Sequence, residues 1–239
     1  MAGRIKRNIP NTITCCNLVS GCIATSFAFA GDMVAALAFI ILGAMFDFFD
    51  GMSSRMLGVT SPIGKELDSL ADDITFGVAP AAMLFFELGV MEYPAQAEPL
   101  RAWLPYTAFI MAAFAALRLA KFNIDTRQAT SFIGLPSPAN ALFWASLIAG
   151  SGNLMEASPY MLVAVLALMA CSCAAMVSGM PMFALKFKHH GWRGNETRYV
   201  FLLSCLPLMA VFRLSSPAII IVWYVVLSAI TARKKSPAI

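Results

Sequence analysis

Long apolar runs fill almost the whole of this chain, and they constrain its fold more than any other feature. Hydrophobic residues make up 59% of the 239 residues and charged residues only 13%, whereas ordinary globular chains contain about 25% charged residues. A soluble core cannot bury this much apolar surface behind so few charges, so lipid must surround most of the chain. We therefore expect an all-α integral membrane protein, and we exclude a disordered chain and a disulfide-stapled secreted protein.

The apolar runs divide into segments of transmembrane length. A bilayer requires about 20 apolar residues per helix, and on this measure the sequence predicts about eight transmembrane helices in a single membrane domain, 1–239. The seventh run is short and contains Pro207, but joining it to the eighth would place Arg213 inside one over-long helix. The predicted spans are 12–30, 33–56, 63–89, 102–122, 132–150, 159–177, 199–212 and 217–231.

Basic residues are distributed unevenly among the connections. If the N-terminal segment 1–11 is cytoplasmic, 15 of the 17 Lys and Arg residues lie on that side, four of them in the basic loop 181–198. Because positive residues concentrate in cytoplasmic loops, we expect both termini to be cytoplasmic, in an inner (cell) membrane. The net charge of +4 is small and the basic groups are scattered, so we expect no nucleic-acid partner.

The cysteines, histidines and tryptophans give no separate site. The six cysteines lie in apolar runs without CxxC spacing, and we expect buried thiols. His189 and His190 have no third His or acid beside them, and we interpret them as part of a solvated loop near anionic headgroups. We interpret three aromatic residues as interfacial or packing groups: Trp192, Trp223 and Tyr224.

Four acidic residues within the segment 46–73 have helical spacing. Asp47 and Asp50 are three residues apart at the end of the second span, and Asp68 and Asp72 are four apart at the start of the third. Each pair therefore shares one helix face. The short connection between the spans folds these faces together, so we expect four carboxylates to converge near the membrane surface.

A cluster of like charges requires a counter-ion. Close carboxylates repel one another, and acids at membrane depth are usually functional. Mg²⁺, Mn²⁺ or Ca²⁺ bind carboxylate oxygens and leave positions for phosphate, so we expect two such ions to clamp a diphosphate here. The alternative is a turn whose acids only face water. Asp73 and Glu66 fall off both faces, and we interpret them as structural.

The acidic segment resembles the signature of the CDP-alcohol phosphatidyltransferase family. Its form here is Asp47-x2-Asp50-Gly51-x2-Ser54-Arg55-x8-Gly64-x3-Asp68-x3-Asp72, with Ser54 where the family usually has Ala. The resemblance implies a CDP-alcohol phosphotransferase-like helical bundle, a homodimer, and attack of an alcohol on a CDP-linked lipid with release of CMP.

The resemblance also implies a role for each matched residue. The metal ligands would be Asp47, Asp50, Asp68 and Asp72, and Asp72 would also be the general base for the incoming hydroxyl. The CDP-lipid contacts would be Asn11, Thr14, Gly51, Arg55 and Ser61. For the stretch Pro10-Asn11-x2-Thr14-x2-Asn17, the alternative is an ordinary helix start capped by Asn11 or Thr12.

Three further stretches resemble the membrane-type, serine-using members of the family. The resemblance implies CDP-diacylglycerol and L-serine as substrates, with serine contacts from Arg118, Lys121 and Asn123. For these residues the alternative is the positive-inside anchor of any span end. Glycerol phosphate, inositol phosphate or choline remain alternative acceptors. A cation transporter is a further alternative, although its site would lie near the membrane midplane. The three stretches are 68–81, 118–123 and 132–139.

Overall fold

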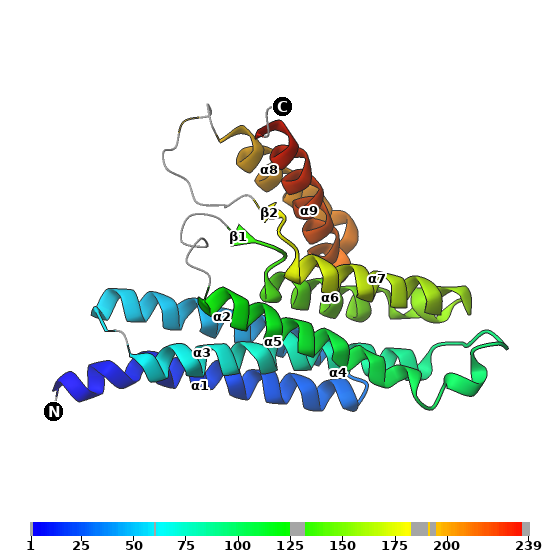
Figure 1. The fold of residues 1–239 in the computed structure, drawn as a ribbon, viewed down its shortest axis with the longest axis horizontal. Helices are drawn as coiled ribbons and strands as arrows, with labels where there is room; N and C mark the ends of the chain where they lie inside the picture. The colour runs from blue at the N-terminus through cyan, green and yellow to red at the C-terminus, as the bar shows by residue number, and fades with distance from the viewer. Residues whose placement is uncertain (1, 60, 125–131, 183–190, 192–194, 236–239) are drawn as a thin grey trace.

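Nine α-helices make up most of the computed structural model, which describes residues 2–59, 61–124, 132–182, 191 and 195–235 (Figure 1). A π-helical turn, Ile74–Val78, joins the third and fourth helices, and two short strands pair antiparallel. The helices and strands are α1 (Ala2–Phe29), α2 (Met33–Leu57), α3 (Pro62–Asp73), α4 (Ala79–Val90), α5 (Phe109–Ile124), β1 (Phe132–Ile133), α6 (Ser137–Glu156), α7 (Tyr160–Val177), β2 (Pro181–Met182), α8 (Glu196–Phe212) and α9 (Ser216–Lys235).

Six stretches of the described chain are long and apolar enough to cross a membrane. The chain is therefore an all-α integral membrane protein, as the sequence predicts. The predicted number of spans is not reproduced, because α6 is not among the six stretches and α8 and α9 share one of them. The stretches are Asn8–Phe29, Met33–Leu57, Pro62–Val90, Leu104–Ile124, Tyr160–Val177 and Glu196–Thr231.

The last of these stretches is an antiparallel pair of helices. A 3₁₀ turn beginning at Arg213, which has a φ of 45°, separates α8 from α9. Trp223 Nε1 of α9 donates a hydrogen bond to Ser204 Oγ of α8 at 2.9 Å. The break that the sequence predicts near Arg213 is present, while Pro207 lies inside α8 without ending it. Figure 1 shows the pair steeply inclined to the other helices.

The first helix begins earlier than the sequence predicts. Helix α1 starts at Ala2 rather than near Thr12, and Pro10 lies inside it. Asn11 is therefore an interior residue of the helix, and its interpretation as an N-cap is wrong. Its side chain does not cap α1 and can therefore contact a neighbouring helix.

The start of α6 is later than predicted. Gly134 has a φ of 75°, the left-handed region that glycine tolerates, and Pro136 restricts the residue before it to extended backbone. A Cβ at position 134 would lie 2.5 Å from the carbonyl oxygen of Met176. The chain consequently stays out of helical conformation from Phe132 and enters α6 at Ser137.

The cysteine prediction is largely wrong, whereas the aromatic prediction holds where it is described. Of the six free cysteines only Cys173 is buried, while three are exposed and two are partly exposed. Tyr224 packs its ring 5.8 Å from that of Phe201. Trp192, His189 and His190 lie outside the described residues.

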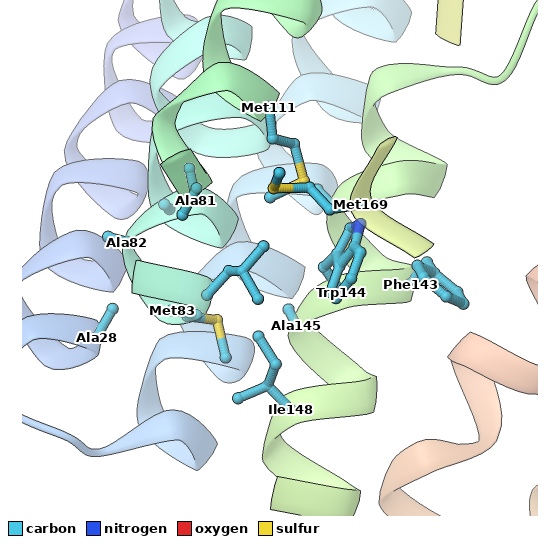
Figure 2. Packing of buried hydrophobic residues seen from close by; sticks show 14 of the residues in the cluster. Ala28, Ala81, Ala82, Met83, Met111, Phe143, Trp144, Ala145, Ile148 and Met169 are labelled. Atoms are coloured by element: carbon cyan, nitrogen blue, oxygen red, sulfur yellow. The ribbon is translucent and has the colours of Figure 1, made fainter. Parts of the chain in front are cut away.

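The buried core centres on the continuous helix formed by α3, the π-turn and α4. This helix is the most enclosed of the six apolar stretches. Figure 2 shows Met83 of α4 and Met111 of α5 facing Trp144 and Ile148 of α6. Trp144 is fully buried and donates its Nε1–H to Ser172 Oγ of α7 at 3.0 Å. The core therefore fixes the helix that carries Asp68 and Asp72.

Two glycines bring α1 and α2 against the π-turn. A Cβ on Gly21 would lie 2.8 Å from Thr75 Cα, and one on Gly43 would lie 2.5 Å from Thr75 Cγ2. Thr75 is fully buried and donates its hydroxyl to the backbone oxygen of Asn17 at 3.0 Å. This contact places the first three helices around one short segment just after the acidic motif.

Candidate active site

The structure brings together carboxylates from two helices. Asp47 and Asp50 of α2 and Asp68 of α3 each place one carboxylate oxygen within 4.8 Å of the others. Asp72, one turn further along α3, lies close enough to these three for their charges to repel. The convergence that the spacing predicts is therefore present, with Asp72 at one side of a three-carboxylate cluster.

The connection between α2 and α3 is a short, well-capped turn. Gly58 ends α2 with a φ of 64°, a left-handed conformation that suits glycine at a helix C-terminus. Ser61 caps α3, and its Oγ accepts a hydrogen bond from Gly64 N at 2.9 Å. Since Ser61 Oγ accepts in this bond, its own hydroxyl hydrogen remains available to a ligand.

The three-carboxylate cluster fits a hard divalent cation. In the described chain Asp68 Oδ1 is buried with no hydrogen-bond partner. Among the residues described, no Lys or Arg forms a salt bridge with Asp47, Asp50 or Asp68. Carboxylate oxygens are the ligands that Mg²⁺ and Mn²⁺ prefer. A bound cation would therefore supply the positive charge that balances these three acids.

A cavity of about 550 Å³ opens beside the cluster between α1, α2 and α3. Its wall includes Asp50 and Asp68 together with four of the five predicted CDP-lipid contacts. The fifth, Arg55, is exposed, and its guanidinium lies next to Gly51, 3.4 Å from the position of a Cβ there. The four contacts in the wall are Asn11, Thr14, Gly51 and Ser61.

Helix α1 contributes directly to this cavity. Thr14 is 3% exposed and donates its hydroxyl to Asp50 Oδ2 at 2.6 Å. A Cβ on Gly64 would lie 2.9 Å from Asn11 Oδ1, so glycine at 64 leaves room for that amide. Thr14 therefore contacts α2, and Asn11 lies against α3.

Asn17, which the motif pattern leaves without a role, lies beside the expected general base. Asn17 is fully buried and donates its Nδ2–H to Asp72 Oδ1 at 3.1 Å. The available signal was spacing, since Asn11, Thr14 and Asn17 recur every three residues on one side of α1. That pattern places a polar stripe along α1 but does not say which carboxylate it meets.

Arg118, one of the three predicted acceptor contacts, is buried near Asp72. Arg118 is 8% exposed and donates from Nη1 to Ser137 Oγ at 3.1 Å. It lies close enough to Asp72 for their charges to attract. The guanidinium also lies over the ring of Phe122, 5.7 Å from its centroid.

The other two predicted contacts have different surroundings. Lys121 is exposed. Asn123 donates from Nδ2 to Ser69 Oγ at 2.8 Å, and its backbone oxygen accepts from Lys65 Nζ at 3.2 Å. These two bonds tie the end of α5 to the outer side of α3.

The two acids that the sequence set aside differ in their surroundings. Glu66 is exposed, and a structural role for it remains a prediction. Asp73 is partly buried next to Gly77, and in the described chain its Oδ1 has no hydrogen-bond partner. A structural role for Asp73 remains a prediction.

Comparison with known proteins matches the chain to one family. The model of a family described as CDP-alcohol phosphatidyltransferase matches residues 7–232. Several relatives are named CDP-diacylglycerol–serine O-phosphatidyltransferase. The protein of Bacillus subtilis is 39% identical over 54% of this chain, that of Helicobacter pylori 35% over 56%, and that of Methanocaldococcus jannaschii 32% over 67%.

The matches cover different shares of these relatives. The matched region spans 69% of the Bacillus protein, 67% of the Methanocaldococcus protein and 54% of the Helicobacter protein. A relative of the same name from Mycobacterium bovis is 32% identical over 59% of this chain, but the match spans only 49% of its own length.

Proposed function

The chain belongs to the CDP-alcohol phosphatidyltransferase family, and from this premise we propose that it transfers the phosphatidyl group of CDP-diacylglycerol to the hydroxyl of L-serine. The products are phosphatidylserine and CMP. The names of the relatives support serine as the acceptor. The motif 46–73 supports the reaction type.

One observation carries the proposal: Asp72 is close enough to interact electrostatically both with the three carboxylates of the cluster and with the buried guanidinium of Arg118. A phosphatidyl transfer needs a group that neutralises a diphosphate, a base for the alcohol, and a site for the acceptor. The cluster of Asp47, Asp50 and Asp68 would neutralise the diphosphate, Asp72 would be the base, and Arg118 would receive the acceptor.

The cavity between α1, α2 and α3 has the lining expected of a nucleotide diphosphate site. Asn11 offers an amide and Ser61 a hydroxyl, while Thr14 lies in the wall with its hydroxyl donated to Asp50. Gly51 leaves room for close approach of the ligand, and the exposed guanidinium of Arg55 next to it would pair with a diphosphate oxygen. We therefore assign the CDP end of the lipid to this cavity.

Asp47, Asp50 and Asp68 would hold Mg²⁺ or Mn²⁺, with Asp72 as a further ligand or as a neighbour of the site. When bound, the metal neutralises charge on the diphosphate and on the departing CMP. The carboxylates would hold the metal ion at a fixed place, because α2 and α3 are joined by a short turn capped at Gly58 and Ser61.

The proton transfer is assigned to Asp72. Its carboxylate takes the hydroxyl proton of serine as the serine oxygen forms a bond to phosphorus and the bond from phosphorus to the CMP oxygen breaks. The hydrogen bond from Asn17 holds the carboxylate in place. Arg118 would pair with the serine carboxylate, because its side chain is buried and its Nε–H has no partner among the described residues.

Lys121 and Asn123 receive a lesser part in the proposal. Lys121 is exposed and would attract anionic lipid or serine to the site. Asn123 already donates to Ser69, and we assign it mainly to holding α5, and with it Arg118, against α3.

The test is CMP release by the purified protein in detergent–lipid micelles containing CDP-diacylglycerol and a divalent metal. Serine should stimulate release and yield phosphatidylserine, whereas glycerol 3-phosphate, inositol phosphate and choline should not. Asp72→Asn serves as the inactive variant. Stimulation by one of the other acceptors and not by serine would refute the serine assignment while leaving the family reaction intact.

Placement in the cell is also a proposal. The distribution of Lys and Arg supports a cell membrane in which the acidic motif faces the cytoplasm. The family resemblance supports a homodimer, which light scattering of the detergent-solubilised protein would test.

A further inference from the structure

The start of α6 holds a buried polar side chain that the reaction described above does not use. Asn140 is fully buried, and neither its Nδ2 nor its Oδ1 has a hydrogen-bond partner in the described chain. Burying an amide with both groups unpaired is unfavourable, so such a residue needs an explanation.

Other buried polar groups of α6 are satisfied. Trp144, one turn further along, donates to Ser172 Oγ at 3.0 Å. Ser146 donates to the backbone oxygen of Leu142 at 2.6 Å. The missing partners of Asn140 are therefore a local feature and not a general property of this helix.

Asn140 shares a face of α6 with the residue that binds Arg118, the expected acceptor contact. Ser137, three residues earlier and on the same helix face, is fully buried and accepts the hydrogen bond from Arg118 Nη1. Arg118 Nε is likewise buried without a partner in the described chain. Both α5 and α6 pack against the π-turn that directly follows Asp72 and Asp73.

We propose that Asn140 recognises the α-amino acid head of the acceptor together with Arg118, an inference that rests on the proposed function. The amide offers one donor and one acceptor side by side, which matches the adjacent carboxylate and ammonium of an amino acid. Nδ2–H donates to the acceptor carboxylate, Oδ1 accepts from its ammonium, and Arg118 Nε–H donates to the same carboxylate. Asn140 is thus a specificity residue and takes no part in the proton transfer.

This arrangement explains discrimination among small alcohols. Ethanolamine lacks the carboxylate and 3-hydroxypropanoate lacks the ammonium, so each leaves one group of the amide unpaired in a buried site. A site built to hydrogen-bond a substrate group rejects analogues that lack it, because its own polar groups then lose their partners.

The experiment compares wild type, Asn140→Leu, Asn140→Asp and the control Ser146→Ala, in which a buried hydroxyl bonded only to its own helix is removed. Serine-dependent CMP release gives the KM of each substrate. The rise in thermal unfolding midpoint caused by L-serine or L-alanine, in the presence of CMP, gives binding of the amino acid head without turnover. The stabilisation caused by CDP-diacylglycerol shows which variants are folded.

For Asn140→Leu we expect the serine KM to rise at least about tenfold, because paired polar groups are lost, with the KM of CDP-diacylglycerol nearly unchanged. Stabilisation by L-serine and by L-alanine should disappear, while Ser146→Ala should behave as wild type. Asn140→Asp keeps the acceptor and loses the donor, so it should weaken L-alanine binding and leave the response to CDP-diacylglycerol intact. If Asn140→Leu does not fold, Asn140→Asp carries the same comparison.

An unchanged serine KM and unchanged amino-acid stabilisation in a variant that still binds CDP-diacylglycerol would overturn the inference and leave the proposed function standing. A wild type that is stabilised by L-serine but does not use it, with stabilisation lost in Asn140→Leu, would refute the proposed function and support this site. Absence of any amino-acid stabilisation or serine turnover in wild type would overturn both.

Discussion

Asn17→Ala should lower the turnover of this protein without weakening its binding of the CDP-linked lipid. In the structure Asn17 donates to Asp72 Oδ1 at 3.1 Å and receives a hydrogen bond from Thr75 on its backbone oxygen. The substitution leaves the backbone contact in place and removes only the amide. Asp72 would keep its place in α3 but lose the donor that orients its carboxylate.

The expected size of the effect follows from that one bond. A hydrogen bond to a charged group contributes about 1.5–3 kcal/mol, and each 1.36 kcal/mol on the barrier corresponds to about a tenfold change in rate. If the bond is fully made in the transition state, kcat should fall by roughly 10- to 150-fold. The KM of CDP-diacylglycerol should change little, because the cavity beside α1 is lined without Asn17.

The assay is initial-rate CMP release at saturating metal with each substrate varied in turn. Ser20→Ala is the matched control, since Ser20 is 3% exposed on the same helix and its hydroxyl bonds only to the backbone oxygen of Cys16. Asn17→Asp should be more damaging than Asn17→Ala, because it places another carboxylate against Asp72. Wild-type kcat in Asn17→Ala, or an equal loss in Ser20→Ala, would refute the positioning role.

Four further predictions concern other parts of the molecule. Asp68→Asn should remove nearly all turnover at ordinary Mg²⁺ or Mn²⁺, as chelation should in wild type, measured by CMP release; an undiminished rate would rule out the carboxylate cluster as the metal site. Arg118→Ala should raise the serine KM by about 10- to 100-fold, because a charge-assisted pair is lost. The KM of CDP-diacylglycerol is the internal reference, and an equal rise in both KM values would assign Arg118 to the lipid phosphate. Gly134→Ala should destabilise the protein by at least about 1–2 kcal/mol in thermal unfolding, because a side chain there is strained and its Cβ meets a carbonyl oxygen; an unchanged midpoint would contradict that geometry. Cysteine labelling should find residues 92–98 outside and 186–198 inside, and finding both on one side would break the orientation inferred from charge.

The part of the site that the sequence predicts well is local. Asp47 with Asp50, and Asp68 with Asp72, are each held together by the period of a helix, and the short connection leaves α2 and α3 few ways to lie apart. The facing of the two pairs therefore follows from spacing alone. The same holds for the break at Arg213, because a charge inside an over-long apolar run is unfavourable.

The part that the sequence does not predict depends on which helix meets which. The bond from Asn17 to Asp72 joins residues 55 positions apart, and that from Arg118 to Ser137 joins two helices. Neither partner can be read from periodicity. The cysteines show a second limit, since hydrophobicity does not distinguish a side chain that faces lipid from one that faces protein.

The π-helical turn at Ile74–Val78 sets the rotation between two halves of one helix. A π-turn accommodates one more residue than an α-helical turn, so it offsets the face that α3 presents from the face that α4 presents by about 100°, the angle per residue of an α-helix. The acids can thus point toward α1 and α2 while Met83 and its neighbours point into the core. Removing one residue from this turn would preserve an unbroken helix and every side chain of the motif, yet it would swing Asp72 about a quarter-turn out of alignment. In this helix, the alignment of Asp72 depends on how many residues the turn contains as well as on which residues they are.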